Sequence, residues 1–339
     1  MYLSWLWYWS TTTRIQVVKA QKVDSLKPGD ESSILYSKEA EFYINFGDFI
    51  GYNKEKFLTI ATNNYVENGV AWVYDRNHPI KLDSPVLSLD NFGVLKIESK
   101  TGGKPIIIYS SPQPINNTVA TLLDTGNFVL EQIHPNGTKS LLWQSFDYPT
   151  DTLIPTMKLG VNRKIGHNWS LVSTLTNSSM STLGEFSLEW EPMEGKLNIK
   201  KSGKVYWKSG KLGRNGLFEN IPANVQHMYQ YIIVSNKDED SFSLKIRDHQ
   251  NYKKFIGWVL FPTGRLTSDE GDIGNADMCY GYNSDGGCQK WEDIPTCRDH
   301  GEVFQKKSGT PNLDSNTTAT FQDNAHYGYS DCKENCWRN

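Results

Sequence analysis

The chain has 339 residues, which is long enough for two or three domains of ordinary size. Its hydrophobic content of 38% and charged content of 22% supply enough apolar material for a well-packed core. The formal net charge is only −3 and the sequence has no basic run, so there is no electrostatic case for binding nucleic acid or an anionic membrane.

The amino-terminal residues 1–22 are expected to be a degraded or incomplete signal segment. Residues 1–9 are apolar and aromatic, but they lack the basic n-region of a signal peptide, and the polar residues 11–14 (TTTR) end the stretch early. No stretch of the chain reaches the roughly eighteen apolar residues that a membrane-spanning helix needs. We therefore expect no transmembrane segment.

From Asp24 the pattern changes to short strands separated by turns. The apolar or alternating runs lie at residues 41–47, 56–61, 69–74, 86–89, 94–97, 105–109, 120–123 and 127–131. No stretch of eleven or more residues here has the periodicity of a helix. The sequence therefore predicts an all-β region.

A weak internal repeat runs through this region. Residues 87–89 lead to Gly93 and a strand, and residues 121–123 lead to Gly126 and a strand, while residues 40–46 (AEFYINF) form a fainter third copy. Repeats of this size indicate stacked β units that share one core. Three of them suit a pseudo-threefold prism.

Residues 141–160 (LLWQSFDYPTDTLIPTMKLG) predict an ordered, partly buried connector. Pro149 fixes its backbone angle, and Asp147 and Asp151 can accept hydrogen bonds from local amides. The string closely resembles the junction of the plant S-domain receptor family, in which a bulb-type (mannose-type) lectin domain precedes an S-locus glycoprotein domain. Residues 71–80 (AWVYDRNHPI) and 205–210 (VYWKSG) resemble strands of these two domains.

This resemblance implies an all-β architecture with successive parts. A β-prism bulb-type lectin domain would span residues 23–155, and a β-rich S-locus glycoprotein domain 156–275. A cysteine-containing, EGF-like linker would span 276–325, and the truncated start of a PAN/apple module 326–339. Strands of the second domain are expected at residues 184–190, 196–199, 205–210, 229–235, 241–247 and 256–261.

The cysteines indicate an oxidising compartment. All five lie near the carboxyl end and are disulfide candidates: Cys279, Cys288, Cys297, Cys332 and Cys336. Since five is odd, at least one has no partner within the chain. A zinc site that adds His300 to the first three is disfavoured because no pair has the close spacing of zinc ligands, so we expect no metal and no cofactor.

Five glycosylation sequons favour the same compartment. Their acceptor residues are Asn116, Asn136, Asn168, Asn177 and Asn316. We therefore expect an extracellular or secreted chain, and the resemblance places full-length family members in the plasma membrane.

Catalytic motifs are not found in the sequence. The family carries a serine/threonine kinase, but this chain has no kinase Gly-rich loop, V-A-I-K, H-R-D or D-F-G motif, so we expect no catalytic residues and no enzyme. A hydrolase whose triad assembles from distant residues is an alternative left open. A product without a stable fold is another.

The mannose motif of bulb-type lectins, Q-x-D-x-N-x-V-x-Y, survives only in part. The best copy aligns Leu123, Thr125, Asn127, Val129 and Glu131, so only Asn127 and Val129 match. The copy after residue 89 aligns Asp90, Phe92, Val94, Lys96 and Glu98, and none matches. A hydrogen-bonded pocket loses most of its affinity when its polar groups are replaced, which predicts a degraded site.

The sequence therefore predicts the extracellular ligand-binding region of an S-domain receptor-like kinase. Asn127 is interpreted as a turn-to-strand residue rather than a ligand. The expected partner is a protein, peptide or glycan, or another receptor in a homo- or hetero-oligomer. The alternative is a working mannose-type lectin.

Overall fold

The computed structural model describes residues 24–48, 56–62, 69–174, 183–247, 257–276, 281–284 and 287–290. The helical elements in these ranges are the single-turn η1 (Ser145–Asp147) and α1 (Ala223–Gln226), and the remaining elements are strands. The all-β prediction is confirmed. In the same ranges no helix has the length and apolar character needed to cross a membrane.

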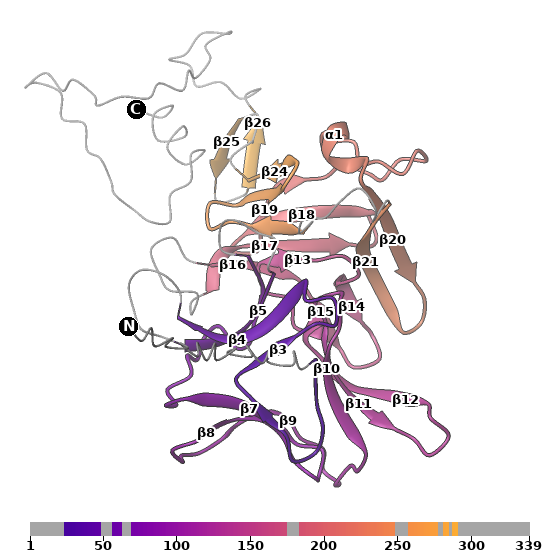
Figure 1. Ribbon diagram of the computed structural model, residues 1–339. Coiled ribbons are helices and arrows are strands. Elements are labelled where there is room, and N and C mark those ends of the chain that lie inside the picture. Colours follow the sequence, from indigo (N-terminus) through magenta and orange to yellow (C-terminus); the bar gives the residue numbers. More distant parts are fainter. Residues whose placement is uncertain are drawn as a thin grey trace, which may run out of the picture.

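The first half of the chain forms three four-stranded antiparallel sheets (Figure 1). The first contains β3 (Ile34–Tyr36), β4 (Phe42–Asp48), β5 (Lys56–Thr62) and β6 (Val70–Val73). The second contains β2 (Glu31–Ser32), β7 (Pro85–Leu89), β8 (Leu95–Ser99) and β9 (Ile106–Tyr109). The third contains β1 (Ser25–Leu26), β10 (Thr118–Leu122), β11 (Phe128–Ile133) and β12 (Lys139–Gln144). The three-sheet prism that the repeat predicts is confirmed.

The repeat corresponds to one turn in each sheet. Gly93 and Gly126 have φ values of 79° and 82°, and their amides donate to the carbonyls of Asp90 and Leu123. The equivalent residue of the faint third copy is Ala40, whose φ is 57° and whose amide donates to the carbonyl of Ser37. The third turn therefore places a residue with a Cβ in the left-handed region, where glycine is less strained.

We expect Ala40→Gly to raise the free energy of unfolding by about 0.5–1 kcal/mol. The left-handed conformation costs an L-residue roughly 1–2 kcal/mol, and the extra chain entropy of an unfolded glycine offsets part of the gain. Urea unfolding measures the change. Ala223→Gly, at an exposed helical alanine, is the control and should lower stability by about the same amount.

The second half forms three further four-stranded sheets. One contains β13 (Thr152–Leu153), β22 (Trp258–Leu260), β23 (Arg265–Ser268) and β24 (Gly271–Asn275). Another contains β15 (His167–Trp169), β14 (Lys158–Asn162), β21 (Glu239–Ile246) and β20 (Tyr229–Ser235). The last contains β16 (Leu171–Thr174), β17 (Leu183–Glu191), β18 (Lys196–Lys201) and β19 (Lys204–Lys208). A hairpin of β25 (Gly281–Ser284) and β26 (Gly287–Lys290) follows.

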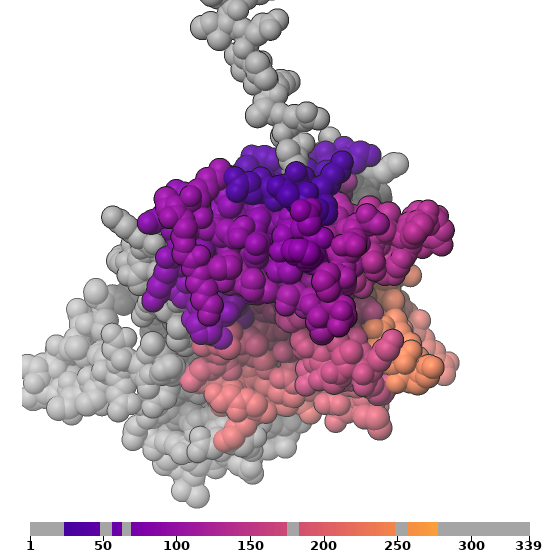
Figure 2. All heavy atoms as spheres, turned by 90° about the horizontal axis from the view of Figure 1, so that it is seen from below, coloured from indigo at the N-terminus to yellow at the C-terminus, as the bar shows by residue number. Residues whose placement is uncertain are grey.

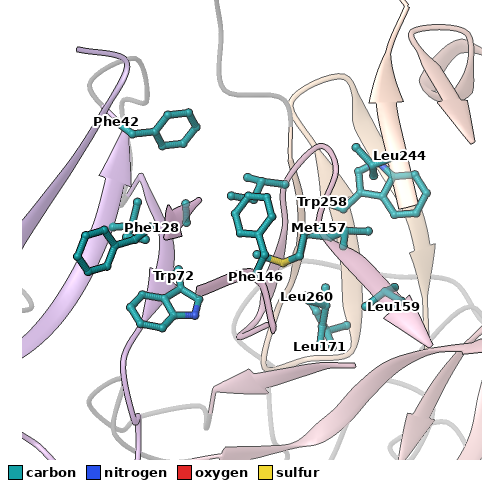
Figure 3. Packing of buried hydrophobic residues seen from close by; sticks show 14 of the residues in the cluster. Phe42, Trp72, Phe128, Phe146, Met157, Leu159, Leu171, Leu244, Trp258 and Leu260 are labelled. Atoms are coloured by element: carbon teal, nitrogen blue, oxygen red, sulfur yellow. The ribbon is translucent and has the colours of Figure 1, made fainter. Parts of the chain in front are cut away.

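The two halves share one hydrophobic core. Figure 3 shows Phe146 and Met157 of the connector between the first-half residues Trp72 and Phe128 and second-half residues such as Leu260. The two halves also lie directly against each other in the space-filling view (Figure 2). The prediction of an ordered, partly buried connector is therefore confirmed for Phe146, which is buried.

Candidate functional site

The surviving mannose-motif residues lie at the start of β11. Asn127 has only 8% of its surface exposed, and its Nδ2 donates to Gln144 Oε1 at 2.9 Å. Its Oδ1 accepts hydrogen bonds from Ser145 Oγ at 3.2 Å and from the amide of Phe146 at 3.3 Å. Val129 is buried. Both the donor and the acceptor of the Asn127 side-chain amide thus form hydrogen bonds with residues of the connector.

The other motif positions of this strand carry no sugar-binding group that matches the motif. Leu123 is an exposed apolar residue, and the carboxylate of Glu131 forms an ion pair with Lys139 at 2.7 Å. The pair joins β11 to β12, because Glu131 and Lys139 belong to these adjacent strands.

The equivalent positions of the second sheet hold a charged network. Asp90 accepts hydrogen bonds from the amides of Phe92 and Val94 at 2.9 and 3.0 Å. Lys96 Nζ lies 2.9 Å from Glu98 Oε1, and Ser88 Oγ donates to Glu98 Oε2 at 2.6 Å. The hydrogen bond from Ser88, with help from Lys96, holds the pKa of Glu98 below its ordinary value.

An aromatic cluster joins the prism to the connector. Trp72 of β6 is fully buried, and its Nε1 donates to the carbonyl of Tyr148 at 2.7 Å. Its ring meets the ring of Trp143 edge to face, with centroids 6.1 Å apart. Tyr148 stacks on Trp143 and contacts the ring of His167 at 5.4 Å. His167 Nε2 donates to the carbonyl of Asp147 at 2.5 Å. Trp72 of the first half and His167 of the second half therefore bind adjacent carbonyls of the connector, those of Tyr148 and Asp147.

A buried ion pair crosses the same junction. Arg76 is 6% exposed, and its Nη2 donates to the carbonyl of Val172 in β16 at 2.7 Å. Its Nη1 lies 4.0 Å from Asp151 Oδ2 and makes no hydrogen bond within the described part of the chain. Burial lowers the pKa of Arg76, against the attraction of Asp151. Burial also raises the pKa of Asp151, which outweighs Arg76 and a hydrogen bond from Thr152.

The raised pKa of Asp151 predicts a pH dependence. The folded protein binds a proton at Asp151 more tightly than the unfolded chain does, so ionisation of this carboxyl costs folding free energy. The stability that wild type gains from this group is present below the ordinary pKa and is lost as pH rises through the raised pKa.

We therefore expect the wild-type free energy of unfolding to fall relative to that of Asp151→Asn as the pH is raised from about 4 to 7. Urea titrations at several pH values measure the difference. Parallel pH profiles for the two proteins would contradict a raised pKa.

Three of the five predicted glycosylation sites lie in described residues. Asn116 is exposed in the segment before β10, and Asn168 is exposed on β15. Asn136 is exposed in the β11–β12 turn, where its Oδ1 accepts hydrogen bonds from the amide and hydroxyl of Thr138. Asn177 and Asn316 lie outside the described residues. All three described acceptor residues are thus exposed, and their glycosylation stays a prediction.

The predicted disulfide region lies almost entirely outside the described ranges. Cys279, Cys297, Cys332 and Cys336, and with them His300, fall outside these ranges, so their pairing stays a prediction. The backbone of Cys288 lies on β26 opposite Asn283. Among the described residues, no group of three or more His, Cys, Asp or Glu could hold a metal ion.

The three-sheet prism and its partly matching sugar motif define a bulb-type lectin scaffold. The family described as D-mannose binding lectin matches residues 69–174. Two G-type lectin S-receptor-like serine/threonine-protein kinases of Arabidopsis thaliana are similar to the chain. CES101 is 36% identical over 219 residues (61% of this chain, 25% of that protein), and At1g67520 is 35% identical over 224 residues (64% and 26%).

The S-locus-specific glycoprotein S6 of Brassica oleracea is also similar, with 28% identity over 219 residues, 58% of this chain and 45% of that protein. A two-domain lectin from Scilla campanulata has 13% identity and a TM-score of 0.21, with 75% of this chain and 87% of that chain covered. The chain belongs to the G-type lectin S-receptor-like family, and it spans about a quarter of the length of the two kinases.

Sequence reasoning missed most of the junction. It singled out residues 71–80 and 141–160, but it did not connect Trp72 with Tyr148, or Arg76 with Asp151 and Val172. A buried arginine in a strand-to-turn stretch and an aspartate between two threonines are individually ordinary, and only the fold brings them together.

Proposed function

We propose that the chain is the extracellular recognition region of an S-domain receptor-like protein, in which the lectin prism serves as a scaffold. Its ligand is a protein, a peptide or a glycan other than one held by the mannose motif. The three exposed acceptor asparagines in described residues support an extracellular location. We attribute the kinase activity in the relatives' names to the parts of those longer proteins that this chain does not match.

One observation carries the proposal. The amide of Asn127, which matches the asparagine of the mannose motif, makes three hydrogen bonds to Gln144, Ser145 and Phe146. A side chain that binds a sugar must offer its donor and acceptor to hydroxyl groups, and this one would first have to break buried bonds inside the fold. The partner positions Leu123 and Glu131 do not supply the missing amide and hydroxyl.

The alternative is a working mannose-type lectin. The match to a family described as D-mannose binding lectin over residues 69–174 favours it. Under this alternative, the affinity would come from another sheet or from residues outside the motif.

A glycan array distinguishes the proposed scaffold from a working mannose-type lectin. The glycosylated chain, produced through a secretory route, is expected to give no signal on mannose-terminated glycans. Isothermal titration with methyl α-mannoside is expected to show no heat of binding. Mannose binding that Asn127→Ala abolishes, in a variant that remains folded, would contradict the proposal.

Asn127→Ala tests the structural role of the same residue. We expect it to lower the free energy of unfolding by about 1–3 kcal/mol, because the amide of Phe146 and the side chain of Gln144 lose buried partners. Asn224→Ala, at an exposed asparagine of α1, is the matched control and should change stability by less than about 0.5 kcal/mol. Chemical denaturation of both variants measures the difference.

A further inference from the structure

Among the described strands, β20 forms one edge of the sheet β15-β14-β21-β20, with no strand paired on its other side. β20 has seven residues, YQYIIVS, with no charged residue and no proline. It pairs with β21 along its whole length without a register shift. Native proteins usually protect such edges with charges, prolines or bulges, so an unprotected edge of this length is a template for another strand.

Other edge strands in the described residues are blocked or short. β15, at the opposite edge of the same sheet, carries the sequon residue Asn168 and has three residues. β12 contains Lys139, follows the turn with the sequon residue Asn136, and pairs with β11 through a register shift. β6 and β9 have four residues each, and both pair through register shifts. β20 is the longest edge strand in these ranges.

The core holds β20 rigidly in place. Tyr229 is fully buried, and its ring meets that of Trp258 edge to face, with centroids 5.6 Å apart. The ring of Tyr231 also packs against Trp258, at 6.0 Å. In contrast, Ile232 and Ile233 are 37% and 44% exposed. In Figure 1 the strand lies on the outer side of the second half, so a preformed edge with apolar side chains is presented there.

We propose that β20 is a self-association site at which a second copy of the chain adds its own β20 in antiparallel orientation. A two-fold axis through the middle residue, Ile232, places Ile232 opposite its counterpart. It also places Tyr231 opposite Ile233 and Gln230 opposite Val234. The strand is self-complementary in this register, as a two-fold interface requires.

Charge selects the antiparallel orientation. Lys245 and Arg247 are exposed beside the first residues of β20, and Arg247 Nε donates to the carbonyl of Tyr229 at 2.6 Å. In an antiparallel pair these cationic ends lie at opposite ends of the interface. A parallel pair would bring them together, and like charges in contact are unfavourable. The occupant that fits is therefore a second copy related by a two-fold axis.

The expected dimer is weak. One seven-residue strand pair buries less surface than a standard stable interface, so association should depend on concentration. Sedimentation velocity of the full, glycosylated chain from about 1 to 100 µM is expected to show a dimer fraction that grows with concentration.

The Ile232→Lys variant tests the edge. A lysine here places two ammonium groups together on the axis and should weaken dimerisation at least about tenfold. Met193→Lys is the matched control, because Met193 is 92% exposed in the turn between β17 and β18, which belong to another sheet. It should leave the dimer unchanged. A wild type that stays monomeric throughout, or a dimer that Ile232→Lys does not weaken, overturns the proposal.

A cysteine at the axis tests the register. Opposed residues of an antiparallel pair have Cα atoms about 4.5–5.5 Å apart, within the reach of a disulfide. With oxidised glutathione as the acceptor of two electrons and two protons, Ile232→Cys should give a covalent dimer on a non-reducing gel. Met193→Cys, which shares all five native cysteines, should give only the wild-type background. Equal dimer bands from the two variants would rule out an axis through Ile232.

Discussion

Replacing Trp72 with alanine is expected to lower the free energy of unfolding by about 3–5 kcal/mol, as for other buried tryptophans. The ring is fully buried in the shared core and packs on Trp143, and its Nε1 binds the carbonyl of Tyr148. The substitution therefore leaves a cavity and an unsatisfied carbonyl at the point where the prism meets the connector.

Trp72→Phe is the control that separates packing from hydrogen bonding. It keeps an aromatic ring but removes the donor to Tyr148, and we expect it to cost about 1–3 kcal/mol. Guanidinium unfolding followed by circular dichroism and by tryptophan fluorescence measures both variants. A loss below about 1 kcal/mol for Trp72→Ala would contradict the role assigned to this ring.

The second large effect is expected for Asp151→Ala, which should lower the free energy of unfolding by about 1–3 kcal/mol near pH 4, and by less near pH 7 because ionisation of Asp151 costs folding free energy. The loss arises because the hydroxyl of Thr152 loses its acceptor Asp151 Oδ1, and because the buried Arg76 loses its neighbouring carboxyl group. The double variant Arg76→Met and Asp151→Ala should recover part of this loss, since the stranded charge is gone.

The exposed pair of Arg265 and Asp272 provides the control for this prediction. The two side chains are 2.6 Å apart, but they are 52% and 37% exposed, so solvent screens their attraction. Asp272→Ala should therefore cost less than about 1 kcal/mol. Equal losses in Asp151→Ala and Asp272→Ala would show that the junction pair behaves as a surface pair. Thermal and urea unfolding of the four proteins measures the comparison.

Local sequence signals were sufficient to predict the prism. Gly93 and Gly126 mark two turns because a positive φ favours glycine, and the alternating strands follow from a two-residue period. The third turn is harder to detect, since Ala40 occupies its left-handed position. Its strand, residues 42–48, still carries the alternation that identifies it.

The candidate site is predictable only in part, because its contacts are long-range. The motif alignment identified Asn127, whose side chain forms hydrogen bonds to residues 144–146, and its interpretation as a structural residue rather than a ligand stays a prediction. The bonds from Trp72 to Tyr148 and from Arg76 to Val172 join residues 76 and 96 positions apart. No local pattern encodes such pairs. The predicted boundary after residue 155 stays a prediction, although Thr152 and Leu153 already pair with β22.

The amino-terminal strands have a consequence for how the chain folds during synthesis. β1, β2 and β3 follow one another within a short segment, yet each belongs to a different sheet of the prism. Ser25 finds its partner only when Thr121 has left the ribosome. β1 is thus made before the other strands of the prism but pairs only after β10 has been made, which makes closure of the prism slow and leaves β1 accessible to chaperones in the meantime.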